Sequence, residues 1–410
     1  MQNKGETYGM GPKLFIACLI NLLAVSTVFM TQPIFADLSA AFAVDITKAR
    51  YAFSVVSLFY TVSFFFLGPA ADKFDLPKMA CTGTLLLSSA VLFSSFTDKF
   101  GLFLIGMAIV GIGAAMVPAS MFPYIAKISP PDKTGVYMGT IVASGTLGVI
   151  FGRVSMGIQT AAIGWQYSFR TVAIILFVLA VVSFFTLVRN NVLKPDNRQK
   201  LPQLFANSIR LLFDLRVLAL LLTGFFLFIG FLGMVTFLTY RLSAPPFNFS
   251  SGEIGWISFA GITALIAPFA GSLSQTTGTH KIVLVGLLIC LLSLQLMGWF
   301  PSTILTALGL LLLFLGVYIV QPLVFLIIGQ SVSRDSLGSA SSMYILFCVG
   351  GGSLSSIFLG PVWQTYGWTG ITISSSLALL ASLLIMSVIA IRERESIGDD
   401  IVPQTDRVDR

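Results

Sequence analysis

Two ionisable residues lie in or beside long apolar segments, where a charge is costly and usually has a function. Arg153 lies about 25 Å along a helix from the start of the apolar run 136–160, and Asp37 about 34 Å from the start of the run 14–36. An acid in such a place can carry a proton, and an arginine can bind an anion. Alternatively, Arg153 extends its charge to the lipid headgroups and Asp37 ends its helix in water.

Uncharged polar side chains inside the apolar runs are weaker candidates for a binding site. They either line a cavity of mixed polar and apolar character or only join one helix to another by hydrogen bonds. We expect a ligand or a coupling ion to contact some of them, together with Asp37 and Arg153. The set consists of Gln32, Tyr60, Tyr240, Gln321 and Tyr344.

No residue pattern typical of an enzyme accompanies these candidates. The sequence contains no Walker loop, no paired carboxylates, no nucleophile beside a base and no cluster of metal ligands. The four cysteines stand inside apolar runs without a CxxC pair, which is typical of small core residues. We therefore expect no enzyme activity, no cofactor and no bound metal.

The chain that carries these residues is too apolar to fold in water. Of its 410 residues, 56% are hydrophobic and 10% are charged, whereas soluble domains contain about 25% charged residues. A helix needs about 20 apolar residues to cross a bilayer. Such runs lie at 14–36, 51–70, 79–97, 101–125, 136–160, 167–188, 215–240, 253–274, 282–299, 303–329, 338–362 and 367–390. The sequence therefore predicts an all-α membrane protein with twelve transmembrane helices.

The positive charges indicate which side of the membrane each loop faces. Most lysines and arginines gather in the loops on one side of the predicted helices, including the basic segment 189–214, and few lie on the other side. Because such an excess marks the cytoplasmic side, we expect both termini in the cytoplasm. The same distribution explains the net charge of +7 without a nucleic-acid partner.

The segment 189–214 also divides the predicted helices into two groups of six. Short matches recur between the groups in the same order at offsets of 203 to 207 residues, as in Gly68 and Gly271. Parallel halves predict a pseudo-two-fold axis along the membrane normal and a binding site between the halves. We thus expect six-helix bundles at 1–188 and 215–390, a cytoplasmic linker at 189–214 and a cytoplasmic tail at 391–410.

The loop after the second helix resembles the signature of the major facilitator superfamily, and the likeness covers the whole chain. The signature reads roughly G-x-L-A-D-R-x-G-R-K, and Gly68, Asp72, Lys73 and Lys78 keep its glycine, its acid and two basic positions. The resemblance implies that Asp72 receives the N-terminus of helix 11 and a nearby cation such as Arg334, closing a cytoplasmic gate. The alternative is a plain solvated acid.

Three positions depart from the family patterns. Asp75 replaces the second glycine of the signature, and the second copy at 271–281 has Gln275 in place of the acid. Helix 4 has Met107 where proton-linked members often have an arginine. Proton coupling through helix 4 is therefore not implied.

The resemblance implies a secondary transporter that works by alternating access. Helices 1 and 5 are neighbours in the resembled fold, so Asp37 and Arg153 would form an ion pair at the outer gate or the binding site. The Gly152-Arg153 pair is similar to a bacterial branch associated with efflux of sugars and drugs. We expect a monomer in the bacterial inner membrane that exports a drug, sugar or metabolite in exchange for protons.

Two other functions are compatible with the sequence. An uptake carrier or uniporter for an anionic metabolite would explain the cations Arg153 and Arg170 and the scarcity of acids inside the helices. A non-transporting sensor on the same fold would need a further domain or a long tail, and only about 20 residues follow the last predicted helix.

Overall fold

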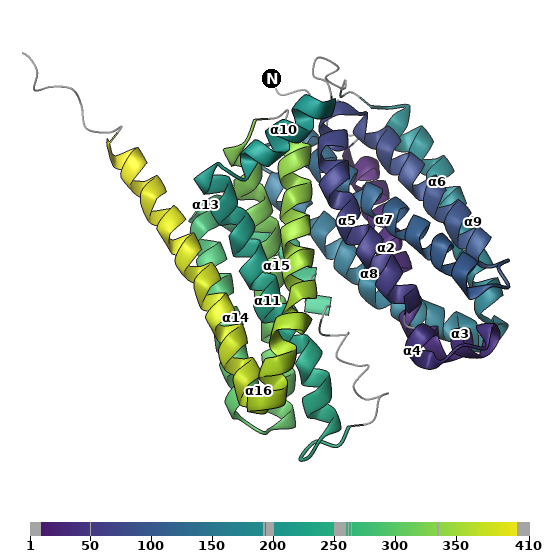
Figure 1. Ribbon diagram of the computed structural model, residues 1–410. Coiled ribbons are helices and arrows are strands. Elements are labelled where there is room, and N and C mark those ends of the chain that lie inside the picture. The colour runs from purple at the N-terminus through teal and green to yellow at the C-terminus, as the bar shows by residue number, and fades with distance from the viewer. Residues whose placement is uncertain are drawn as a thin grey trace, which may run out of the picture.

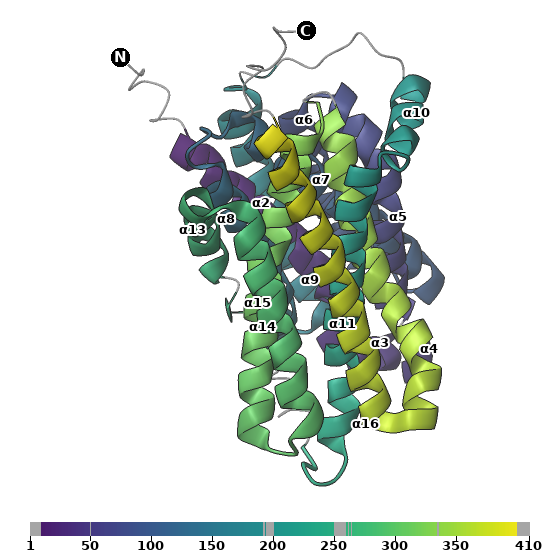
Figure 2. The ribbon, with the colours of Figure 1, turned by 90° about the vertical axis from the view of Figure 1, so that its left-hand side faces the viewer.

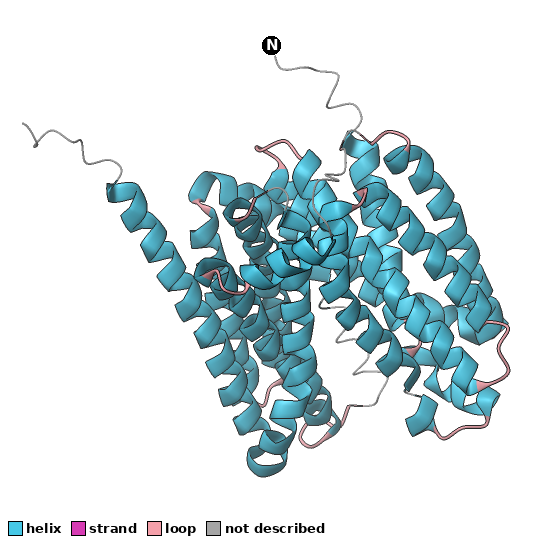
Figure 3. Ribbon diagram, turned by 45° about the horizontal axis from the view of Figure 1, so that its top comes forward, coloured by secondary structure: helices cyan, strands magenta, loops and turns pink. Residues whose placement is uncertain are grey.

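The computed structural model (Figure 1) describes residues 10–49, 51–191, 193, 201–249, 260, 262–263, 265–333 and 336–399. Its long helices run side by side along one axis (Figure 2). Within the described ranges every regular element is a helix (Figure 3). The all-α fold predicted from the apolar runs is thereby confirmed.

The first half of the chain forms one bundle. Its helices are α2 (Met10–Phe29), α3 (Phe35–Phe42), α4 (Ile46–Ala49), α5 (Tyr51–Lys73), α6 (Leu76–Ser94), α7 (Phe100–Ile128), α8 (Thr134–Ile163) and α9 (Trp165–Ser183). A 3-10 turn, η1 (Gln32–Ile34), follows α2, and a π-helical turn, η2 (Phe184–Val188), extends α9. Because α2 packs on α8, α5 on α7, and α6 on α7 and α9, the long helices share one apolar core.

The second half forms the other bundle. It contains α11 (Leu215–Ser243), α13 (Ala267–Thr277), α14 (Thr279–Trp299), α15 (Thr303–Ser331) and α16 (Leu337–Asp399). Gly367, with φ of 56°, interrupts α16 and divides it into two helices. A separate short helix, α10 (Leu201–Leu211), precedes the bundle.

The two bundles stand side by side and are joined mainly at one end. In Figure 1 they lie closest at the end that carries α10 and diverge towards the end that carries α3 and α4. The contacts across the halves include those of α5 and α7 with α16, and of α8 with α13 and α15. We name the two ends after a residue of each, the Asp72 end and the Asp37 end.

The membrane-spanning helices agree with the predicted runs. Ten segments of the described chain are long and apolar enough to cross a membrane, and one of them, from Leu337 to Arg392, contains the two helices that meet at Gly367. The first part of the predicted run 253–274, residues 253–259, lies outside the described residues, and α13 begins within the run at Ala267.

Three local features differ from the expected boundaries. The run 14–36 is not one helix, because α2 ends at Phe29 and Pro33 lies in the following 3-10 turn. The linker 189–214 contains α10, an amphipathic helix. The last helix continues to Asp399, into the region expected to be a tail.

Close packing of α2 on α8 fixes the part of α8 that carries the predicted site. A Cβ atom on Gly148 or Gly152 would collide with the backbone of α2, so both positions require glycine at this helix spacing. The Asn21 side chain of α2 donates hydrogen bonds of 3.0 Å to the Ile141 carbonyl and the Ser144 hydroxyl of α8. Residues of α8 that follow Gly152 are therefore held against the end of α2.

Candidate functional site

The Asp72 carboxylate joins the two halves directly. It lies in the last turn of α5 and is buried. Its Oδ1 accepts a 2.6 Å hydrogen bond from the Gly338 backbone N–H, and its Oδ2 accepts one of 2.8 Å from the Ser339 N–H. The Ser339 hydroxyl also donates to Oδ2. Because these donors form the N-terminus of α16, the carboxylate is stabilised by the positive end of the helix dipole.

Glycines bring the backbones of the two halves together around this contact. A Cβ on Gly68 would lie 3.1 Å from the Cα of Ser339. In the second half, a Cβ on Gly271 would collide with the backbone of Gly135 in α8. The pair Gly68 and Gly271, related by the internal repeat, thus makes equivalent contacts with the opposite half.

The basic residues predicted beside Asp72 have separate positions. Lys73 is half-buried and its Nζ lies 5.9 Å from the centre of the Phe74 ring, while Lys78 is exposed. Arg334 lies outside the described residues. The cation that acts electrostatically on the Asp72 carboxylate is Lys127, in the last turn of α7, which the loop motif did not indicate.

Further contacts between the halves extend from the Asp72 end towards the middle of the bundles. The rings of Phe122 in α7 and Phe325 in α15 meet edge to face with centres 5.1 Å apart. The Tyr318 side chain of α15 lies beside Thr146 of α8, about 18 Å along the helix from its start. The halves are therefore in contact over more than a third of the length of α8.

Arg153 lies beyond these contacts, about 10 Å further along α8 than Thr146. It is half-buried, and its Nε–H donates a 2.7 Å hydrogen bond to Oε1 of Gln32 in η1. Its guanidinium carbon lies 5.2 Å from the centre of the Phe29 ring, a cation–π arrangement. The structure thus brings together two of the predicted site residues, Arg153 and Gln32, with an aromatic ring.

Asp37 is not part of this group. It is exposed in the first turn of α3, and within the described part of the chain its carboxylate forms no hydrogen bond or ion pair. The expected Asp37–Arg153 ion pair is therefore not formed in this conformation. The physical reason is the break after α2, which places Gln32 in the turn that faces Arg153 and directs the chain away before Asp37.

The remaining candidates occupy three places. The buried Tyr344 hydroxyl donates to the Gln321 carbonyl at 3.4 Å, so these two residues lie together between α16 and α15. Tyr60 is half-buried and packs edge to face on Phe64. Tyr240 is 56% exposed near the end of α11.

Comparison with known proteins identifies the family. The family model described as Major Facilitator Superfamily matches residues 14–356. The chain belongs to the major facilitator superfamily. A putative uncharacterized transporter, YgaY of Escherichia coli K12, is 28% identical over 373 residues, which cover 88% of this chain and 92% of the relative.

Two further members are similar to this superfamily transporter. The multidrug resistance protein MdtG of Salmonella paratyphi A is 28% identical over 252 residues, or 59% of this chain and 60% of the relative. The crystal structure of the transporter FucP in the outward conformation superimposes with a TM-score of 0.75 at 15% identity, covering 92% and 98% of the two chains. At this identity the likeness shows the shared fold alone.

Proposed function

We propose that this superfamily transporter is a secondary transporter that exports a small organic solute, such as a drug, sugar or metabolite, across the bacterial inner membrane in exchange for protons. The observation that carries the proposal is the one-sided contact between the halves. Among the described residues the halves are in contact from Asp72 to Thr146, whereas Arg153 and Gln32 lie beyond these contacts. This arrangement suits a site that opens to one side at a time.

The excess of positive charge favours the cytoplasm as the location of the Asp72 end. On that orientation the conformation described here is outward-facing, with the cytoplasmic gate closed. Export then requires the Asp72 carboxylate to leave the N-terminus of α16, Gly68 to separate from Ser339, and Gly271 to separate from Gly135. The contacts are suited to this change, because the interface consists of a few hydrogen bonds and van der Waals contacts that can break together when the halves move apart.

Three observations support efflux and proton exchange. A relative that matches about three fifths of the chain is named a multidrug resistance protein. The group formed by Arg153, Gln32 and Phe29 combines charge, an amide and an aromatic ring, which would accept a solute of mixed polarity. Asp37, exposed and without a bonded partner among the described residues, is the acid proposed to carry the proton.

An uptake carrier or uniporter for an anionic metabolite is the second candidate. It is favoured by one observation, the half-buried guanidinium of Arg153 inside a membrane helix. A guanidinium binds carboxylate or phosphate with paired hydrogen bonds. On this alternative Arg153 holds the substrate and no proton is exchanged.

Transport by the purified protein in liposomes decides between the two candidates. Liposomes with and without a pH gradient are tested against a panel of sugars, organic anions and cationic drugs. The proposal expects accumulation of a neutral or cationic solute only when the gradient is present. Counterflow of an organic anion that is unchanged by the gradient would replace the proposal with the alternative.

A further inference from the structure

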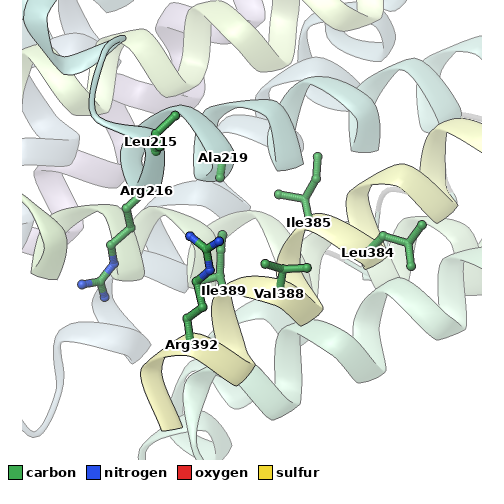
Figure 4. A pocket seen from close by; sticks show the side chains of 8 residues that line it. All are labelled: Leu215, Arg216, Ala219, Leu384, Ile385, Val388, Ile389 and Arg392. Carbon is green, nitrogen blue, oxygen red and sulfur yellow. The ribbon is translucent and has the colours of Figure 1, made fainter. Parts of the chain in front are cut away.

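A groove lies between α11 and α16 at the Asp72 end, away from the contacts between the halves. Its volume is ≈ 540 Å³, within the range of small-molecule sites. Two arginines, Arg216 of α11 and Arg392 of α16, belong to its lining (Figure 4). The rest of the lining is aliphatic and includes Ala219, Leu384, Ile385 and Val388.

The charges and the aliphatic side chains occupy different parts of the groove. Figure 4 shows both guanidinium groups towards one end and Leu384 towards the other. The apolar part of α11 begins at Val217 and that of α16 ends at Ile391, so the two arginines flank the apolar parts of these helices. Leu384 lies about 12 Å deeper along α16. With 58% of its surface exposed, Leu384 faces the lipid.

In the first half of the chain, a hydrogen bond joins the helices that correspond to α11 and α16 at the equivalent position. By the internal repeat, Arg216 lies 203 residues after Lys13, and Arg392 lies 203 residues after Arg189. In the first half, Lys13 of α2 donates a 2.9 Å hydrogen bond to the Asn190 carbonyl, just after the π-helical turn η2. In the second half the helix instead continues regularly past Arg392, and the groove separates it from α11.

We propose that this groove binds an anionic phospholipid of the adjoining leaflet, with its phosphate at Arg216 and Arg392 and an acyl chain along Leu384 and Val388. Guanidinium groups bind phosphate oxygens through paired hydrogen bonds. A basic groove between membrane helices near the boundary suits such a headgroup.

Native mass spectrometry of the full chain in mixed micelles tests the proposal. The probes are phosphatidylglycerol and phosphatidylcholine with identical acyl chains. We expect the wild-type protein to retain phosphatidylglycerol in preference, and retention to fall roughly 5-fold for each arginine replaced and roughly 30-fold in the Arg216→Gln, Arg392→Gln double variant. The matched control is Arg189→Gln, which removes the equivalent charge from the first half and should retain the lipid fully.

A second variant leaves the charges in place. Ala219→Trp fills the groove and should lower phosphatidylglycerol retention as much as loss of both arginines, which keeps the test valid if the double variant does not fold. Equal retention of the two lipids by the wild-type protein would overturn the proposal. So would unchanged retention by either the double variant or Ala219→Trp. Because the readout is bound lipid, the result does not depend on the transported solute.

Discussion

The Nε–H of Arg153 donates a 2.7 Å hydrogen bond to Oε1 of Gln32, and this bond connects α8 to the turn that ends the first membrane helix. The contact lies beyond the region in which the described residues of the two halves touch. It orients a guanidinium group at the depth where a solute entering from the Asp37 end would meet it. The following predictions examine this contact and those that control access to it.

Replacing Gln32 by Leu removes the acceptor while keeping a similar side-chain volume. We expect initial transport rates to fall about 10-fold, because an unoriented guanidinium binds with poorer geometry. Arg153→Gln should reduce transport about 100-fold or more, since it removes the charge as well. Rates in liposomes at equal protein content provide the measurement, with Lys99→Gln, an exposed cation at the same end, as the control. Normal transport by both variants would exclude the pair from the site.

Asp37→Asn tests the proposed proton carrier separately from solute binding. If Asp37 carries the proton, the variant should lose transport driven by a pH gradient, while exchange of labelled for unlabelled solute continues. The comparison of the two assays in the same liposome preparation gives the answer. Gradient-driven transport at the wild-type rate would assign proton coupling to another group or exclude it.

Asp72→Asn should weaken the joint between α5 and α16. A carboxylate that accepts from two backbone N–H groups is replaced by an amide with one acceptor, and hydrogen bonds to charged groups contribute about 1.5–3 kcal/mol. We expect the population with an open Asp72 end to rise about 10- to 100-fold. Spin-label distances between cysteines introduced at the exposed Lys133 and Lys281 would show a longer component.

The neighbouring Asp75 supplies the control for that experiment. Asp75 accepts from the Lys78 backbone N–H at 3.0 Å and caps α6 within the first half. Because Asn caps helices nearly as well as Asp, Asp75→Asn should leave the distances unchanged. A distance distribution that is the same for Asp72→Asn and Asp75→Asn would contradict the gate role.

Gly271→Ala should force the halves apart at the Asp72 end without changing any charge. The added methyl group would meet the backbone of Gly135, which cannot move independently of α8. We expect the same longer spin-label distance, together with slower transport. Gly101→Ala adds a methyl where nothing lies within 4 Å and should behave as the wild type. Wild-type distances in Gly271→Ala would show that the interface relaxes without opening.

Arg241→Ala should destabilise the second half rather than alter transport chemistry. The Arg241 guanidinium carbon lies 4.5 Å from the centre of the Trp368 ring, and its Nη1 and Nη2 donate to the carbonyls of Met297 and Phe300. We expect a loss of about 1–3 kcal/mol. Thermal unfolding in detergent measures it. Arg241→Lys should not restore the wild-type midpoint, because an ammonium cannot make the same forked contact.

The positions of the helices along the chain could be predicted because the bilayer imposes a length of about 20 apolar residues. The separation of the last two helices follows from the runs 338–362 and 367–390, and the contact of Asp72 with the N-terminus of helix 11 follows from the family pattern. The break after Phe29 did not follow, because Gln32 and Pro33 continue an apolar run whose length alone suits one helix. The amphipathic helix α10 was likewise not predicted, because the segment 189–214 was interpreted from its charge as a linker.

The sequence analysis named both Arg153 and Gln32 as candidates, but it did not predict their contact with each other or with Phe29. Counting residues along a helix gives the depth of Arg153, but not the direction in which its side chain points. Depth alone made Asp37 a suitable partner. The partner of Arg153 is Gln32 because of the direction that the chain takes at η1. A count of residues along a helix does not give this direction.

The helix α10 determines where the polypeptide must bend when the bundles move. Phe205 of α10 packs against the rings of Phe65 and Phe66 in α5, so this helix is attached to the first half. It ends at Leu211, and α11 of the second half begins at Leu215. If the bundles rock as proposed while α10 stays on α5, the backbone torsions must change within residues 212–214, and this short segment would act as the hinge.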